Sequence, residues 1–418
     1  MNIQIKKEIP FKGDYDIIVA GGGVAGVAAA VNGARMGKKV LLIEKTITLG
    51  GLATIGLVNY FVPMCNGRGT QIIKGMAEEM FQLAIQYGYD SVPKDWAKGE
   101  PGEGTTQQRD VTMFSVPIYI MALTEFVKSS GAELMFDTVV SDVVMEGNKC
   151  MGVVIHNKSG FGYYTAKTFV DTTGDADLLH LAGVPTVQGS DFHTFFAFQT
   201  NIEHCKQVVE HEDMRYLQMN VHGGKASLYG DRHPEGKPKW HGTDAEEVTR
   251  YVIENHHELL ESLKEDDRRK REVYNIPTMP QFRTTRRLDG DYTLVEEDKY
   301  KHFEDSVGAI CDFDRRDYLY EIPLRTLCKK EFPNIITAGR SASGDGYGWD
   351  ILRVIPPAII EGQAAAVVCS MAIDSSCGVA EVDIKKLQSV LESQNVIIHF
   401  DDALINDNGG EKFESDHI

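Results

Sequence analysis

The sequence has no pair of cysteines spaced C-x-x-C. Its 7 cysteines are scattered, and even the two nearest, Cys369 and Cys377, are well separated. Closely spaced cysteine pairs are the usual mark of iron–sulfur and zinc sites, so we expect no metal. The first stretch, MNIQIKKEIPFKGD, also lacks the apolar core of a signal sequence. An odd number of cysteines without such a leader favours a reducing compartment, and we expect a cytoplasmic protein.

Positive charge is also scarce. The chain has 43 lysines and arginines against 61 aspartates and glutamates, which gives a net charge of -18 at pH 7. Nucleic acids and anionic membranes bind positively charged surfaces, so we expect neither as a partner. A small anionic substrate is still compatible with this balance, because arginines can line a pocket inside an acidic protein.

Long uninterrupted apolar runs are missing as well. The most apolar late stretch, VIPPAIIEGQAAAVVCSMAI, is broken by Pro357, Glu361 and Gln363. We therefore expect no membrane span there.

What the chain does have is a glycine-rich turn near its start, in VAGGGVAGVAAAVNGARMGKKVLLIEK (Val19 to Lys45). An apolar strand precedes the turn, an alanine-rich helix follows, and a second strand ends at Glu44. In this order Gly21 permits the tight turn, Gly23 lets the backbone approach a pyrophosphate, and Gly26 lets helix and strand pack closely. Glu44 would accept hydrogen bonds from ribose hydroxyls. The complete pattern predicts a bound dinucleotide, but it does not separate FAD from NAD.

A second glycine loop follows in KTITLGGLATIG, with Gly50 and Gly51 soon after the acid and Thr54 beyond. Here the chain resembles the glutathione-reductase-like flavoproteins, in which a double glycine lets the backbone approach the ribityl and pyrophosphate groups. An NAD-only dehydrogenase does not need this second loop. The resemblance therefore implies FAD.

The segment from Gly131 to Pro185 is similar to the same flavoproteins. It begins with a strand-like AELMFDTVV, continues as a meander of short strands and ends in FVDTTGDADL. The resemblance implies that Val139 or Val140 brings backbone to the adenine. Asp175 and Asp177 are open to two interpretations, as paired acid–base carboxylates or as structural residues at the domain crossover. The resemblance favours the structural role.

A third block, NIITAGRSASGDGYGWDILRVIPPAIIEGQAAAVVCSMA, resembles the C-terminal motif of the FAD-dependent oxidoreductase family. Tricarballylate dehydrogenases and fumarate reductases look like more distant relatives. The resemblance implies that Asp345 binds the ribityl chain and that Arg353 precedes a helix whose N-terminus faces the flavin. Pro356 and Pro357 suit the first turn of that helix. The arginine-rich stretch PQFRTTRRLDGDYTLVEED and the tail VDIKKLQSVLESQNV also resemble this family.

Together these motifs predict bound FAD, held without a covalent bond because GGLATIG has no histidine. The residues expected to contact FAD are Gly21, Gly23, Val24, Ala25, Gly26, Glu44, Lys45, Gly50, Gly51, Leu52, Ala53, Thr54, Val139, Val140, Thr173, Gly174, Asp175, Gly339, Asp345, Arg353 and Val354.

The predicted fold is α/β, a discontinuous Rossmann-like FAD-binding domain with an inserted α+β substrate domain. We expect the FAD-binding domain at 10–60, 115–190 and 320–375, a helical and loop insertion at 61–114, a substrate domain at 189–319, and a C-terminal helix and tail at 376–418. The insertion should hold a helix over 70–88 and a glycine-rich loop over 97–110. A long polar helix is expected over 244–275.

Five residues are candidates for the chemistry. His193 is expected in a strand of the substrate domain, as a proton carrier or as a hydrogen-bonded histidine at a sheet edge. Tyr347 and Asp350 lie between two predicted flavin contacts and could replace a histidine that the family often has at the position of Gly346. Arg283 and Arg286 would share a face if they lay on a helical turn. They would then clamp a carboxylate or pair with acids such as Glu296 and Glu297.

We expect an oxidoreductase that moves a hydride between FAD and a small polar, anionic or sugar-like substrate, at a C–OH or C–C bond. The alternatives are a flavin monooxygenase or halogenase using NAD(P)H and oxygen, and a non-catalytic flavoprotein. The expected partners are a small-molecule substrate, an unidentified electron donor or acceptor, and a second copy of the chain.

Overall fold

The computed structural model describes residues 6–89, 92, 112–406 and 409–410. The loop expected at 97–110 lies outside these ranges. The helices are α1 (Val24–Arg35), α2 (Met76–Ile85), α3 (Val116–Ser130), α4 (Asp177–Leu181), α5 (Ile202–His211), α6 (Ala245–Leu263), α7 (Tyr347–Arg353), α8 (Ile355–Ser375) and α9 (Ile384–Ser393).

The central sheet contains β1 (Phe11–Ala20), β2 (Val40–Ile43), β5 (Glu133–Met135), β6 (Val139–Glu146), β7 (Lys149–Asn157), β8 (Gly160–Asp171) and β16 (Ile335–Thr337). Five of these strands are parallel, in the order β5-β2-β1-β8-β16. The other two, β6 and β7, form an antiparallel meander with the first half of β8. Strands flanked by helices in this order confirm the predicted α/β, Rossmann-like fold.

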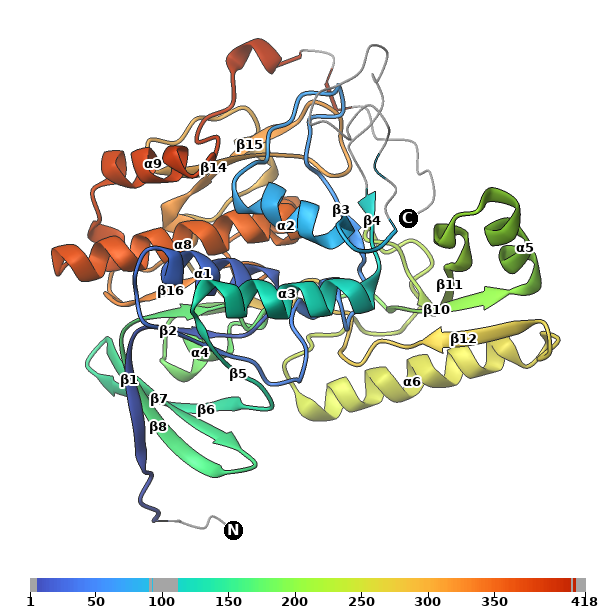
Figure 1. Ribbon diagram of the computed structural model, residues 1–418, viewed down its shortest axis with the longest axis horizontal. Coiled ribbons are helices and arrows are strands. Elements are labelled where there is room, and N and C mark those ends of the chain that lie inside the picture. Colours follow the sequence, from blue (N-terminus) through green and yellow to red (C-terminus); the bar gives the residue numbers. More distant parts are fainter. Residues whose placement is uncertain (1–5, 90–91, 93–111, 407–408, 411–418) are drawn as a thin grey trace.

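Small residues bring α1 and α8 together over this sheet (Figure 1). A Cβ added at Gly362 of α8 would lie 2.1 Å from the carbonyl oxygen of Ala25 in α1, so only glycine permits this approach. α1 ends at Arg35, two residues before Gly37, which has φ +78 with open space around it. α8 is long and apolar enough to cross a membrane by composition, but 89% of its apolar window is buried inside the protein. Its apolar character is therefore explained by its place in the core.

A second, outer sheet lies to the right in Figure 1 beside α5 and α6. It contains β10 (Thr194–Asn201), β11 (Met219–Lys225) and β12 (Arg271–Asn275), in the order β11-β10-β12. The remaining strands form pairs: β3 (Tyr60–Phe61) with β4 (Thr112–Met113), β9 (Thr186–Gln188) with β13 (Arg286–Leu288), and β14 (Ser306–Cys311) with β15 (Leu319–Pro323).

Two predicted helices are shorter than expected. The polar helix over 244–275 ends with α6 at Leu263, and residues 271–275 pair with β10 as β12 instead. The polar sequence of residues 271–275 is compatible with a helix or a strand, and pairing with β10 selects the strand. The helix expected over 70–88 begins only at Met76, because Gly75 before it has φ +64.

Candidate functional site

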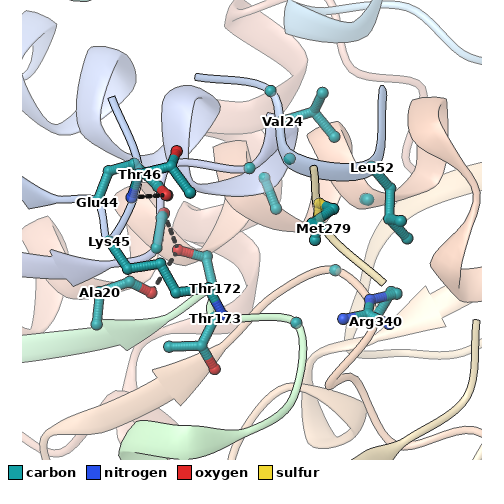
Figure 2. Close-up of a pocket in the computed structure, with 18 of the residues that line it drawn as sticks. Ala20, Val24, Glu44, Lys45, Thr46, Leu52, Thr172, Thr173, Met279 and Arg340 are labelled. Carbon is teal, nitrogen blue, oxygen red and sulfur yellow. Dashed lines mark hydrogen bonds between the residues drawn. The ribbon is translucent and has the colours of Figure 1, made fainter. Parts of the chain in front are cut away.

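A cavity opens where four parallel strands end (Figure 2). Ala20 ends β1, Ile43 ends β2, Thr172 follows β8 and Ala338 follows β16, and all four line the cavity. Ligands of open α/β sheets bind at this carboxyl edge. The position alone marks the cavity as a binding site.

The first glycine turn fits a dinucleotide by its shape. Gly21 has φ +104, and an added Cβ would lie 2.4 Å from the carbonyl oxygen of Thr172. At Gly26 it would lie 1.9 Å from the carbonyl oxygen of Gly21, because the helix packs directly on the turn. Gly23 has nothing nearer than 4.0 Å, so its backbone is open to the cavity. The N-terminus of α1 thus presents free backbone N–H groups where phosphates would bind.

Glu44 lies at one end of the cavity beside Lys45 and Thr46 (Figure 2). Its Oε1 accepts a hydrogen bond from the backbone nitrogen of Thr46 at 2.7 Å. Its Oε2 accepts one from the backbone nitrogen of Gly22 at 2.6 Å. A carboxylate has about four acceptor positions, so lone pairs remain for ribose hydroxyls.

The second glycine loop is bonded to the first. The backbone nitrogen of Gly50 donates to the carbonyl oxygen of Gly22 at 2.8 Å. Gly50 and Gly51 have φ +100 and +55, which favours glycine at both positions. The hydroxyl of Thr54 turns inward and donates to the carbonyl oxygen of Leu49 at 2.6 Å. Gly50 and Gly51 therefore offer backbone to the cavity, and Thr54 supports the loop from inside.

The other end of the cavity is formed by residues far along the chain. Met279 and Arg340 lie across from Leu52 in Figure 2. The turn at Gly339 is held by the buried Glu361 of α8, whose Oε2 accepts from the backbone nitrogen of Gly339 at 2.5 Å. Burial raises the pKa of Glu361. The first turn of α8 reaches the cavity through Ile355 and Ala358.

Most of the predicted FAD contacts line this cavity. They are Gly21, Gly23, Val24, Ala25, Glu44, Lys45, Gly50, Gly51, Leu52, Ala53, Val139, Val140, Thr173, Gly174, Gly339 and Arg353.

Five predicted contacts lie elsewhere: Gly26, Thr54, Asp175, Asp345 and Val354. Gly26 packs against the first glycine turn, and Thr54 is hydrogen-bonded within the second loop. The carboxylate of Asp175 is taken by Arg340 and by the hydroxyl of Thr285, each at 2.7 Å. Asp345, predicted to bind the ribityl chain, is 69% exposed and lies 3.4 Å from the guanidinium of Arg287. Val354 caps α8.

Sequence reasoning missed several lining residues: Ala20, Ile43, Thr46, Ile55, Thr138, Thr172, Asp177, Met279, Ala338, Arg340, Ile355 and Ala358. Many of these flank residues that were predicted. Arg340 follows Gly339 directly, so the AGR triplet could have revealed it. Met279 follows no motif, because its place depends on how a distant segment folds back over the cavity.

None of the five candidates for the chemistry lines the cavity. His193 is fully buried just before β10, and Trp240 Nε1 donates to its Nδ1 at 3.1 Å. Its Nε2 lies 3.0 Å from Glu258 Oε1 and 3.1 Å from Lys237 Nζ. Burial lowers the pKa of His193. This geometry corresponds to the second interpretation of His193, as a hydrogen-bonded structural histidine.

Tyr347 and Asp350 have different hydrogen-bond partners. Tyr347 donates from its hydroxyl to Asp312 Oδ1 at 2.6 Å, and burial raises its pKa far above the ordinary value. Asp350 Oδ1 accepts from Nε of Arg353 at 2.6 Å. Because Arg353 lines the cavity, Asp350 contacts the cavity wall.

Arg283 and Arg286 do not lie on a helical turn. Arg286 is the first residue of β13, which pairs with β9. Arg283 lies in the irregular segment before that strand. Neither pairs with Glu296, which binds Arg315 instead. Arg286 donates to Asp177 Oδ1 at 2.7 Å.

Comparisons with known proteins agree with this site. A family model described as "FAD dependent oxidoreductase" matches residues 16–391. The chain is 28% identical over 179 residues to the tRNA uridine 5-carboxymethylaminomethyl modification enzyme MnmG of Chlorobium chlorochromatii. That match covers 41% of this chain and 27% of that protein, so it spans about a quarter of the relative's length.

Two solved structures resemble the chain over most of its length. A geranylgeranyl bacteriochlorophyll reductase-like protein from Thermoplasma acidophilum is 16% identical, with a TM-score of 0.42 and 94% of each chain covered. The Mycobacterium smegmatis Sdh1 complex in the apo form is 12% identical, with a TM-score of 0.46, and covers 92% of this chain and 72% of that one.

Proposed function

The chain belongs to the FAD-dependent oxidoreductase family, and from this premise we propose that it moves a hydride between FAD and a small anionic or strongly polar, sugar-like substrate at a C–OH or C–C bond. When bound, the flavin supplies the hydride or electron transfer itself. The chain's part is to bind the substrate, orient it and move one proton.

The observation that carries this proposal concerns a group of five arginines near the cavity. Four of them have a carboxylate partner: Arg286 with Asp177, Arg287 with Asp345, Arg340 with Asp175 and Arg353 with Asp350. The fifth, Arg283, forms no ion pair with any residue that the structure describes. A guanidinium that is partly withdrawn from solvent and has no ion pair favours an anion as its partner.

Arg283 is well placed for such an anion. Burial lowers the pKa of Arg283 and the neighbouring Arg353 lowers it further, whereas the carboxylates of Asp191 and Asp350 raise it in part. Its own backbone nitrogen and that of Thr284 donate to Asp191 Oδ2 at 3.0 and 2.9 Å, which fixes the turn that carries the side chain. An anionic group bound between Arg283 and Arg353 would relieve the repulsion between the two cations. Since Arg353 lines the cavity, that group would lie at its edge.

The proton is best assigned to Asp350. Among the three predicted proton carriers, Asp350 contacts a residue of the cavity wall, whereas His193 is enclosed by residues around the outer sheet and Tyr347 is bound to Asp312. The N-terminus of α8 adds a positive dipole at Ile355, which would stabilise negative charge that develops nearby.

The experiment is anaerobic bleaching of the flavin with a panel of hydroxy acids, unsaturated acids and sugar acids. We expect at least one to bleach the wild type, and Arg283→Lys to raise the concentration needed by about 10- to 100-fold while FAD stays bound, because a charge-assisted hydrogen bond contributes ~1.5–3 kcal/mol. Arg286→Lys is the matched control, since its partner is Asp177.

If Arg283→Lys and the wild type need the same substrate concentration for bleaching, Arg283 does not bind the anion. Rapid oxygen consumption with NAD(P)H, without bleaching by any acid, would instead favour the monooxygenase alternative.

The expected partners and location follow from charge and cysteine chemistry. A net charge of -18 supports a small molecule over a nucleic acid or an anionic membrane. All seven cysteines are free, which is compatible with the cytoplasm. We also propose that the protein uses a separate electron donor or acceptor and that it forms a homo-oligomer.

A further inference from the structure

Two histidines and a glutamate converge outside the flavin cavity. His302 precedes β14, Glu321 lies on β15, and His399 belongs to the segment after α9. β14, β15 and the C-terminal segment gather in the upper part of Figure 1. Each of the three residues offers one potential ligand atom, and these three atoms lie within 4.8 Å of one another.

Glu321 is the centre of this cluster. Its side chain is fully buried, and its Oε2 accepts from the backbone nitrogen of Phe303 at 2.7 Å. Its Oε1 lies 2.6 Å from Nδ1 of His302 and 3.0 Å from Nδ1 of His399. Within the described part of the chain, the ion pairs of Glu321 are with these two histidines, so no lysine or arginine neutralises it.

A second carboxylate orients the first histidine from behind. Nε2 of His302 lies 2.9 Å from Asp402 Oδ1, and the imidazole stacks on Phe400 with ring centroids 4.3 Å apart. A neutral imidazole has a single N–H, so without a bound ion only the protonated ring can donate to Glu321 and Asp402 at once. A cation at Nδ1 would leave the N–H at Nε2 for Asp402. Metal-binding histidines almost always donate their other N–H to a carboxylate or carbonyl in this way.

We propose that His302, His399 and Glu321 bind a divalent transition-metal ion, with zinc as the best match. Imidazole nitrogen and carboxylate oxygen are both zinc ligands, and three of them leave a coordination position for water. His302 and His399 are 40% and 42% exposed, so an ion can enter from solvent. No sequence motif predicts this site, because its three ligands are widely separated along the chain.

The ion would connect β15 to the C-terminal segment. None of the three ligands lines the flavin cavity, so the ion is not expected to take part in the flavin chemistry. Binding to the folded chain alone would raise its stability in proportion to the logarithm of the zinc concentration.

The test uses the full chain, stripped with a chelator and titrated with Zn²⁺ by calorimetry, with metal analysis after dialysis. We expect one zinc per chain and a melting temperature that rises with zinc. His302→Gln and His399→Gln should each weaken binding by about 100-fold or more, since each removes a direct ligand. Asp402→Asn should weaken it by about 10- to 100-fold, as loss of an outer partner does. Mg²⁺ should not substitute.

His257→Gln is the matched control. Nδ1 of His257 lies 3.8 Å from Glu261 Oε1 on the exposed face of α6, a histidine–carboxylate pair without a second histidine. Its removal should leave zinc binding unchanged. Because Glu321→Gln could disturb folding, the decision rests on the two exposed histidines, with circular dichroism of each variant. The proposal is overturned if the wild type takes up no zinc, or if both histidine variants bind it as tightly as the wild type.

Discussion

The Oε2 atom of Glu44 lies 2.6 Å from the backbone nitrogen of Gly22, so the acid after β2 is bonded to the glycine turn after β1. Glu44 therefore shapes the phosphate-binding turn in addition to any contact with the ribose. Its two bonds to backbone nitrogens make the turn and the acid one unit. Loss of the carboxylate should affect both parts of that unit.

Glu44→Ala should weaken FAD binding by about 10- to 100-fold, because charge-assisted hydrogen bonds contribute ~1.5–3 kcal/mol. Glu44→Gln, which keeps one acceptor oxygen, should lose less affinity for FAD. The dissociation constant of FAD, measured by fluorescence titration of the stripped protein, checks this. Glu125→Ala, an exposed acid on α3, serves as the control. Unchanged FAD retention in Glu44→Ala would refute the assignment.

Gly26→Ala should disrupt the FAD site. The new Cβ would lie 1.9 Å from the carbonyl oxygen of Gly21, so α1 must move away from the turn. Overpacking of this kind costs about 1–3 kcal/mol or more. Gly13→Ala in β1 is the control, since its nearest neighbour lies at 3.7 Å. Thermal melting and FAD content should fall in the first variant only; equal behaviour of the two would contradict the close packing.

FAD should leave the protein on denaturation. No histidine, cysteine or tyrosine is found among the described residues that line the cavity, so none is placed to form a covalent bond with the flavin. Precipitation with acid or heat should leave a yellow supernatant containing FAD. Colour that stays with the pellet, or release of FMN, would count against this expectation.

Arg286→Met should lower stability while leaving the substrate requirement unchanged. The variant loses the bond to Asp177 and a second, at 2.8 Å, to the carbonyl oxygen of Asp175. We expect a loss of about 1–3 kcal/mol in the free energy of unfolding. Urea unfolding measures it, alongside steady-state kinetics. A raised KM with an unchanged unfolding midpoint would show that Arg286 contacts substrate instead.

Asp312 should make stability fall as pH rises toward neutrality. Burial raises the pKa of its carboxyl from 3.8 to about 6. Between these values the folded chain keeps a proton that the unfolded chain releases, so this contribution to stability is present at low pH and is lost as pH rises through about 6. The full change is at most on the order of 3 kcal/mol.

Asp312→Asn should remove this dependence, because the amide cannot ionise and still accepts from the Tyr347 hydroxyl. Urea unfolding from about pH 4.5 to 7 compares the two proteins, and the stability of the wild type relative to the variant should decrease as pH rises. Asp142→Asn, at an exposed position of β6, should keep the wild-type profile. Parallel profiles for Asp312→Asn and the wild type would exclude Asp312 as the source.

The sequence was sufficient wherever a local segment determines its own shape. The turn around Gly21 to Gly26, the double glycine at Gly50 and the start of α8 each carry their geometry in adjacent residues. It was insufficient where the outcome depends on pairing with distant segments. Residues 271–275 form β12 because β10 is available, and their charged residues give no sign of it.

The same reason explains why the contacts of several predicted site residues could not be read from the sequence. Asp345 was expected at the ribityl chain, but its contact is Arg287, far back in the sequence. His193 is enclosed by Trp240, Lys237 and Glu258, whose approach no spacing rule predicts. Met279 reaches the cavity from a segment without a motif.

Strand β8 is shared by two halves of the molecule, and this has a consequence for biosynthesis. Its first half pairs with β7, but its last three residues pair with β16, more than a hundred positions later in the chain. Domains fold as they emerge from the ribosome, at about 5–20 residues per second. Gly339, Arg353 and Ile355 emerge with or after β16, so the newly made chain cannot complete a flavin site until translation has passed them. Cofactor capture should therefore be a late event, which follows synthesis of the glycine turn by many seconds.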